Sequence, residues 1–147
     1  MQRIEGEIVI CRPVANVFDF VADERNEPQY HPQMRRVEMI STGPIACGTR
    51  FHSELGRNVE MVWEITAYER PQRLGGVGCA VVRLFTAVPA LDTQGTLTFD
   101  PVPGGTRMRW LCLSSEKLAT MLLKWSTTDD VRESNIGPCH DAALTEK

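Results

Sequence analysis

The sequence lacks the features that mark several common classes of protein. No apolar run approaches the roughly 18 residues of a membrane-spanning helix. Sixteen Lys and Arg against 19 Asp and Glu give a net charge of −3, whereas nucleic-acid-binding domains usually carry a basic face. The first ten residues alternate charged and apolar side chains, unlike a signal peptide. We therefore expect a soluble, cytoplasmic protein that binds no nucleic acid and is not integral to a membrane.

Metal sites and catalytic nucleophiles are also missing from the sequence patterns. The chain has no CxxC pair, and its five cysteines are widely spaced: Cys11, Cys47, Cys79, Cys112 and Cys139. This spacing is typical neither of a disulfide framework nor of a zinc site, so we expect reduced thiols. His31, His52 and His140 fall on three separate segments. There is no GxSxG motif, and the GGVG stretch lacks the strand–turn–helix context of a phosphate loop. We expect no metal and no cofactor, and the sequence identifies no catalytic residue.

The N-terminal part is predicted to form a strand followed by two helical segments. Residues 3–11 carry isoleucines at even positions, which predicts a strand. Residues 13–23 begin with a proline and then space their apolar side chains as i, i+3, i+4 and i+7, as in an amphipathic helix. A second, short helical turn is predicted for residues 24–29.

Six further strands are predicted between residues 37 and 114. In the third of these, Met61 and Trp63 lie on one face, while Glu60, Glu64 and Tyr68 lie on the other. The predicted strands cover residues 37–42, 48–55, 59–69, 74–87, 94–102 and 106–114.

The short connections between strands predict an antiparallel sheet, with a hairpin turn at Gly104–Gly105. A sheet with one apolar face needs a cover. The only long candidate is a C-terminal helix starting at residues 114–115, whose apolar stripe ends at Trp125. We predict an α+β fold: a curved antiparallel sheet of about seven strands, two short helices, and a C-terminal helix over a central cavity. A single domain would span residues 1–135, followed by a polar tail at 136–147.

Three patches carry a family resemblance: IVICRPVANVFDFVADERNEPQYHP, GPIACGTRF, and the pair WEITAYERPQRL and GTLTFDPVPGGTRMRW. In order and spacing they resemble the helix-grip fold of the SRPBCC superfamily, which includes START-type lipid-transfer domains and the birch-pollen allergen. The resemblance is greatest to its bacterial polyketide cyclase/dehydrase branch. It implies an internal cavity that takes a small hydrophobic, lipid-like or aromatic molecule. The short apolar stripe of the final helix departs from the family pattern.

Strand alternation and this resemblance together give the candidate ligand-binding residues. They are Tyr30, His31, Met61, Trp63, Arg83, Phe99, Met108, Trp110, Met121 and Trp125. Tyr30 either lines the cavity mouth or packs under its loop, and His31 either contacts ligand or points to solvent. Arg83 is a buried cation if its strand phase faces inward and a surface residue if it faces outward.

Three functions are compatible with these residues. The first is binding of a small hydrophobic molecule without covalent catalysis. The second is a polyketide cyclase, aromatase or dehydratase, in which Tyr30, His31 or Arg83 would orient or protonate a carbonyl. The third is a protein-interaction module, including a homodimer, in which a partner covers an apolar mouth. The first two predict different occupants of one cavity, and the third predicts self-association or another protein partner.

Overall fold

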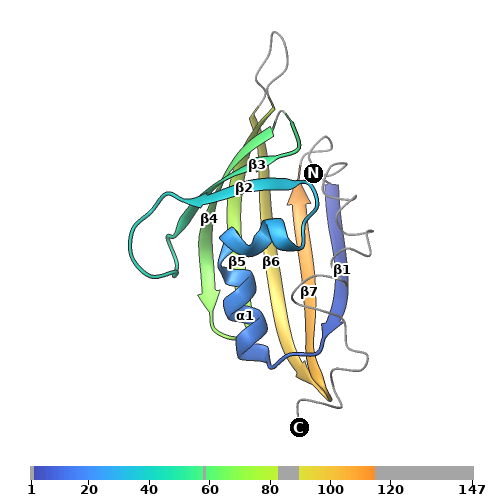
Figure 1. Ribbon diagram of the computed structural model, residues 1–147. Helices are drawn as coiled ribbons and strands as arrows, with labels where there is room; N and C mark the ends of the chain where they lie inside the picture. Colours follow the sequence, from blue (N-terminus) through green and yellow to red (C-terminus); the bar gives the residue numbers. More distant parts are fainter. Residues whose placement is uncertain (1, 58, 83–89, 115–147) are drawn as a thin grey trace.

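The computed structural model describes residues 2–57, 59–82 and 90–114, which form one antiparallel sheet curved around two helices (Figure 1). Strand β1 (Gln2–Ile10) leads into helix α1 (Val14–Ala22) and the 3₁₀ helix η1 (Glu24–Gln29). The remaining strands are β2 (Met34–Met39), β3 (Arg50–Leu55), β4 (Val59–Glu69), β5 (Arg73–Val82), β6 (Ala90–Val102) and β7 (Gly105–Ser114). The predicted α+β helix-grip fold with seven strands is confirmed. The predicted C-terminal helix lies outside the described residues.

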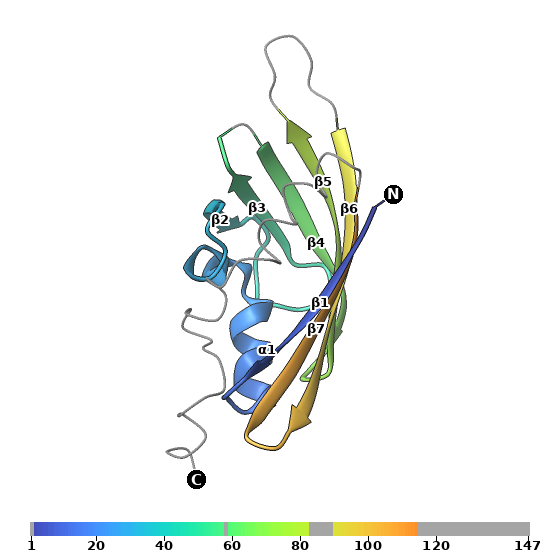
Figure 2. The same ribbon diagram turned by 90° about the vertical axis from the view of Figure 1, so that its right-hand side faces the viewer.

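The sheet order is β1-β7-β6-β5-β4-β3-β2, so six strands form a meander and the first strand pairs with the last. Both helices lie on the concave side of the sheet (Figure 2). The hairpin between β6 and β7 turns at Gly104, whose φ of 84° favours glycine. No helix in the described part of the chain is long and apolar enough to cross a membrane.

The core lies between α1 and the concave face. Phe18 of α1 is fully buried, and its ring packs edge-on against Phe99 and Tyr68, each with ring centroids 5.2 Å apart. Edge-to-face aromatic pairs of this kind add about 0.5–1.5 kcal/mol beyond the apolar area that they bury. Asp19 of α1 also pairs with Arg70, with N–O distances of 2.7 and 2.8 Å. These contacts hold α1 in a fixed position over one end of the sheet.

The position of Tyr68 in the structure differs from the one predicted from strand alternation. The sequence pattern placed Tyr68 on the face opposite Met61 and Trp63. In the structure a register shift between Ile65 and Ala67 inserts an extra residue into β4. A β-bulge reverses the alternation beyond it, so Tyr68 pairs across from Leu74 and packs into the core.

Glycines on the concave face leave room for two tryptophan side chains. A Cβ atom built on Gly76 would lie 2.4 Å from Trp63 Cε2, and one on Gly78 would lie 2.9 Å from Trp63 Cε3. A Cβ on Gly95 would lie 3.2 Å from Trp63 Cη2. The Trp63 indole therefore lies flat across β5 and β6, on backbone that no side chain covers.

The Trp110 indole packs in a similar way against a glycine of strand β1. A Cβ on Gly6 would lie 2.4 Å from Trp110 Cζ2, and the register places these two residues opposite each other. The GGVG stretch, which lacks the context of a phosphate loop, and the glycine of β1 thus leave room for the indoles.

One cysteine differs from the expectation. Cys11 is disulfide-bonded, so the prediction of reduced thiols is wrong at this position. Cys47, Cys79 and Cys112 are free thiols, as expected.

We predict that Gly76→Ala destabilises the protein by about 1–3 kcal/mol, because overpacking a filled site forces the indole and the backbone apart. The new Cβ would also lie 2.6 Å from the Glu64 carbonyl oxygen. Urea unfolding followed by circular dichroism measures the change.

Gly75→Ala is the matched control. Its nearest atom would be Ala67 Cβ at 3.3 Å, and Ala in a strand loses less conformational entropy than Gly. We expect a change under about 1 kcal/mol. Equal losses of unfolding free energy in the two variants would contradict the conclusion that Gly76 leaves room for the Trp63 ring.

Candidate functional site

A cavity of about 120 Å³ lies between η1 and the concave face of the sheet. An apolar cavity of about 150 Å³ is known to hold a benzene-sized molecule, so this space suits one ring or a short chain. It is smaller than the 300–1,000 Å³ usual for ligand pockets. The lining residues come from η1 and four strands: Glu24, Glu27, Met61, Trp63, Leu74, Gly75, Thr93, Gly95, Thr96, Leu97, Trp110, Leu111 and Cys112.

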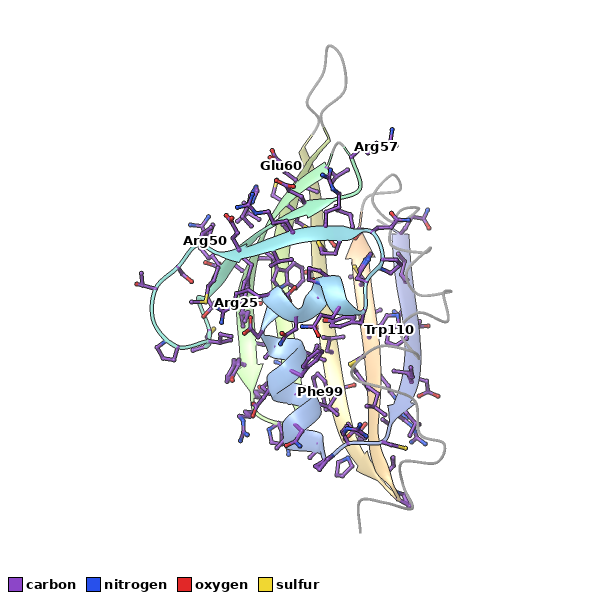
Figure 3. The ribbon with its side chains drawn as sticks, viewed as in Figure 1. Arg25, Arg50, Arg57, Glu60, Phe99 and Trp110 are labelled. Carbon is purple, nitrogen blue, oxygen red and sulfur yellow. The ribbon has the colours of Figure 1, made fainter. Side chains whose placement is uncertain are left out.

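Two indoles form much of the apolar wall. Trp63 rests on Gly76, Gly78 and Gly95, so one face of its ring lies on the sheet and the other is turned towards the cavity. Trp110 stands on β7 on the side of the sheet that faces the helices, as does Phe99 on β6 (Figure 3). Aromatic faces of this kind attract both apolar rings and cations.

The acidic wall comes from η1. A 3₁₀ helix has three residues per turn, so residues three apart lie on one face. Glu24, Glu27 and the C-cap residue Tyr30 have this spacing. Glu24 and Glu27 line the cavity, whereas Arg25 and Pro28, on other faces of the helix, are exposed.

Contacts at both ends hold η1 in this orientation. Asp23 caps the helix by accepting a hydrogen bond from the Arg25 backbone N–H at 3.1 Å, and its carboxylate pairs with the Arg25 guanidinium. Asn26 donates to the Phe20 carbonyl of α1 at 2.9 Å. The ring of Tyr30 contacts Phe20, with centroids 6.1 Å apart.

The two glutamates have perturbed acidity. Glu24 and Glu27 are half-buried. Desolvation of the carboxyl against the cavity wall, followed by the charge of Glu27 and a hydrogen bond with it, raises the pKa of Glu24 well above its ordinary value. Burial also raises the pKa of Glu27, although its hydrogen bond with Glu24 acts in the opposite direction. Two carboxyls this close favour sharing a proton over carrying two charges.

Tyr30 completes the row beneath the glutamates. Burial raises the pKa of its phenol well above the ordinary value, and the carboxylates of Glu27 and Glu24 raise it further. The phenol therefore stays protonated.

The far end of the cavity is polar but neutral. The hydroxyls of Thr93 and Ser114 lie 2.5 Å apart, and the Cys112 thiol is 3.3 Å from each. These groups satisfy one another, so they offer no charge to a ligand.

The structure divides the predicted site residues into three groups. Met61, Trp63 and Trp110 line the cavity. Tyr30, His31, Phe99 and Met108 are buried in the protein interior and are not among its lining residues. Arg83, Met121 and Trp125 lie outside the described residues.

The structure excludes one of the two alternatives for His31, the solvent-facing one. His31 is 1% exposed, so it does not point to solvent, and it does not line the cavity. Its Nδ1 accepts a hydrogen bond from the Gln33 backbone N–H at 3.3 Å. Burial lowers the pKa of the imidazole to about 4, so the ring is neutral near pH 7.

Sequence reasoning missed Glu24 and Glu27, although their signal was present. The spacing Glu24, Glu27, Tyr30 is a three-residue repeat, which forms one straight row if the short helix is 3₁₀ and is spread over about 120° if it is α. No group of three metal-binding side chains converges within the described ranges.

Comparison with known proteins identifies the family. Residues 1–133 match the family described as polyketide cyclase / dehydrase and lipid transport, and the chain belongs to it. Membership supports a role in ligand binding or cyclisation. A comparison with curated protein sequences gives no match.

Solved structures share the fold at low sequence identity. Protein Ms6760 from Mycobacterium smegmatis is 16% identical, with a TM-score of 0.62 over 88% of this chain and 85% of that one. The di-domain ARO/CYC protein BexL of the BE-7585A biosynthetic pathway is 16% identical, with a TM-score of 0.60 over 89% of this chain and 44% of its own. Ara h 8.0201 is 12% identical, with a TM-score of 0.59 over 84% and 88%.

We predict that Glu24→Gln stabilises the protein at neutral pH by at least about 1 kcal/mol. The pKa of Glu24 is raised in the folded state. Its contribution to the stability of the protein is therefore fully present below the pKa of the unfolded state and is lost as the pH rises. The gain should therefore vanish near about pH 4. Urea unfolding of the original protein and of the variant, between about pH 4 and neutral pH, measures this gain in stability. Glu64→Gln, which removes one charge from the other face of the sheet, should show no such gain; equal gains in both variants would contradict the assignment.

A second prediction concerns His31, whose folded pKa is about 4 against an ordinary 6.5. The unfolded chain takes up the proton first, so this group's contribution to stability is present above about pH 6.5 and falls by about 3 kcal/mol as the pH drops through 4. The His31→Gln variant should lack this loss. Parallel stability profiles for the two proteins between these pH values would show that the imidazole is not buried in its neutral form.

Proposed function

We propose that the protein binds a small hydrophobic molecule, lipid-like or aromatic, in the cavity between η1 and the sheet. The observation that carries this proposal is the packing of the Trp63 ring against glycine backbone. Three glycines hold its ring against the sheet, and the exposed ring face becomes part of a wall shared with Met61 and Trp110.

Burial of apolar surface sets the scale of affinity. Covering about 150 Å² of ligand surface supplies roughly 4 kcal/mol. Because the loss of ligand freedom reduces this figure, a dissociation constant near about 1 mM is the tightest that apolar contact alone supports. Apolar contact alone therefore supports weak binding of a one-ring compound. Larger ligands would have to extend beyond the described cavity.

The cyclase alternative has less support from the residues. It expected Tyr30, His31 or Arg83 to meet a carbonyl. Tyr30 and His31 do not line the cavity, and Arg83 lies outside the described residues. The family and the resemblance to BexL keep cyclisation as a coarse alternative. The homodimer and the cytoplasmic location stay predictions.

The proposed function predicts that Met61→Trp weakens binding of benzyl alcohol by about tenfold, because the larger side chain fills the cavity. The indole N–H signals of Trp63 and Trp110 in ¹H–¹⁵N NMR spectra report binding, and Trp→Phe variants assign them. Native mass spectrometry of the purified protein would identify any molecule that it retains.

Val62→Trp is the matched control, because Val62 neighbours Met61 but lines a hollow on the opposite face of the sheet. Benzyl alcohol should bind this variant as it binds the original protein. Equal losses in both variants, or in neither, would contradict binding in this cavity.

A further inference from the structure

The cavity has an unbalanced charge. Of the described residues that line it, two are acidic and none is basic. Glu24 and Glu27 hydrogen-bond with each other rather than with a cation. The nearby Asp23 is compensated by Arg25, 2.8 Å away, on a side of η1 that does not line the cavity.

Such a pair lowers the stability of the empty protein. Carboxylates in apolar surroundings are unfavourable unless an opposite charge or hydrogen-bond donors meet them. The contacts of Asp23, Asn26 and Tyr30 hold η1 so that Glu24 and Glu27 face the cavity. The orientation is therefore fixed by the fold and is not an accident of two mobile side chains.

The opposite wall suits the same charge. The faces of indole rings attract cations, with Trp the most effective of the aromatic side chains. Trp63 and Trp110 line the same cavity as the two carboxyls. A protonated nitrogen placed between them would gain charge-assisted hydrogen bonds from one wall and ring contact from the other.

We propose that the ligand is a small aromatic or aliphatic amine, bound as its ammonium ion with the nitrogen at Glu24 and Glu27 and the apolar part against Trp63 and Trp110. This inference rests on the proposed function, because it assigns the chemical class of the ligand in that cavity. The apolar part supplies the weak affinity derived above, and the ammonium group adds the selectivity.

The test uses three one-ring probes that differ in charge: benzylamine, benzyl alcohol and benzoate. Each is titrated near about pH 7 into the full-length protein, with the indole N–H signals of Trp63 and Trp110 as the readout. We expect benzylamine to bind at least about tenfold tighter than benzyl alcohol, and benzoate to bind weakest because it meets like charge.

Substitution of the carboxyls separates charge from shape. The double variant Glu24→Gln/Glu27→Gln keeps the size of both side chains. It should reduce the preference for benzylamine over benzyl alcohol to below about threefold. Glu64→Gln also removes one negative charge, but from the other face of the sheet, and should retain the full preference.

The outcomes distinguish the two proposals. Equal binding of benzylamine and benzyl alcohol would leave hydrophobic binding intact and overturn the amine. Tightest binding of benzoate would overturn it as well. If none of the probes shifts either indole signal, the cavity binds no one-ring ligand and both proposals fail. A preference for benzylamine that survives in the double variant would place the ammonium elsewhere and overturn the assignment to this pair.

Discussion

The close approach of the Trp63 indole to bare backbone is the constraint on which the rest of the site depends. Antiparallel pairing brings Gly76, Gly78 and Gly95 next to one another on the concave face. Side chains at these positions would fill the ring's place, as the 2.4 Å approach at Gly76 shows. With the ring flat on the sheet, space is left between it and η1. The cavity thus follows from the absence of three side chains as much as from the presence of one.

The second constraint is the pitch of η1. Three residues per turn put Glu24, Glu27 and Tyr30 in one row, whereas an α-helix would turn Glu27 about 60° and Tyr30 about 120° away from Glu24. The cap at Asp23 and the tie from Asn26 to Phe20 fix the helix against α1. Because α1 is itself held by Phe18 in the core, the acidic wall is positioned by packing that lies outside the cavity.

The sequence was sufficient for the architecture and for part of the site. The strand signals identified the seven strands of the described part of the chain, and alternation placed Met61, Trp63 and Trp110 on the cavity side because no bulge precedes them in their strands. It failed at Tyr68, where the bulge reverses the phase. The glycine surface beneath Trp63 could not be predicted from residues close together in the sequence, because Gly95 and Gly76 become neighbours only through the pairing of β5 with β6. Glu24 and Glu27 were overlooked since charged residues in a short turn usually face solvent.

The arrangement of charge bears on what the cavity is for. A purely apolar ligand would be served best by apolar side chains at positions 24 and 27, since the carboxyls lower the stability of the empty protein without improving apolar contact. Interiors tolerate such groups chiefly at functional sites, where perturbed acidity accompanies a task. The neutral end at Thr93, Cys112 and Ser114 has no such imbalance, because its groups bond to one another. In the proposed complex, the asymmetry between the two ends would direct the polar group of the ligand to η1 and its apolar part along the sheet.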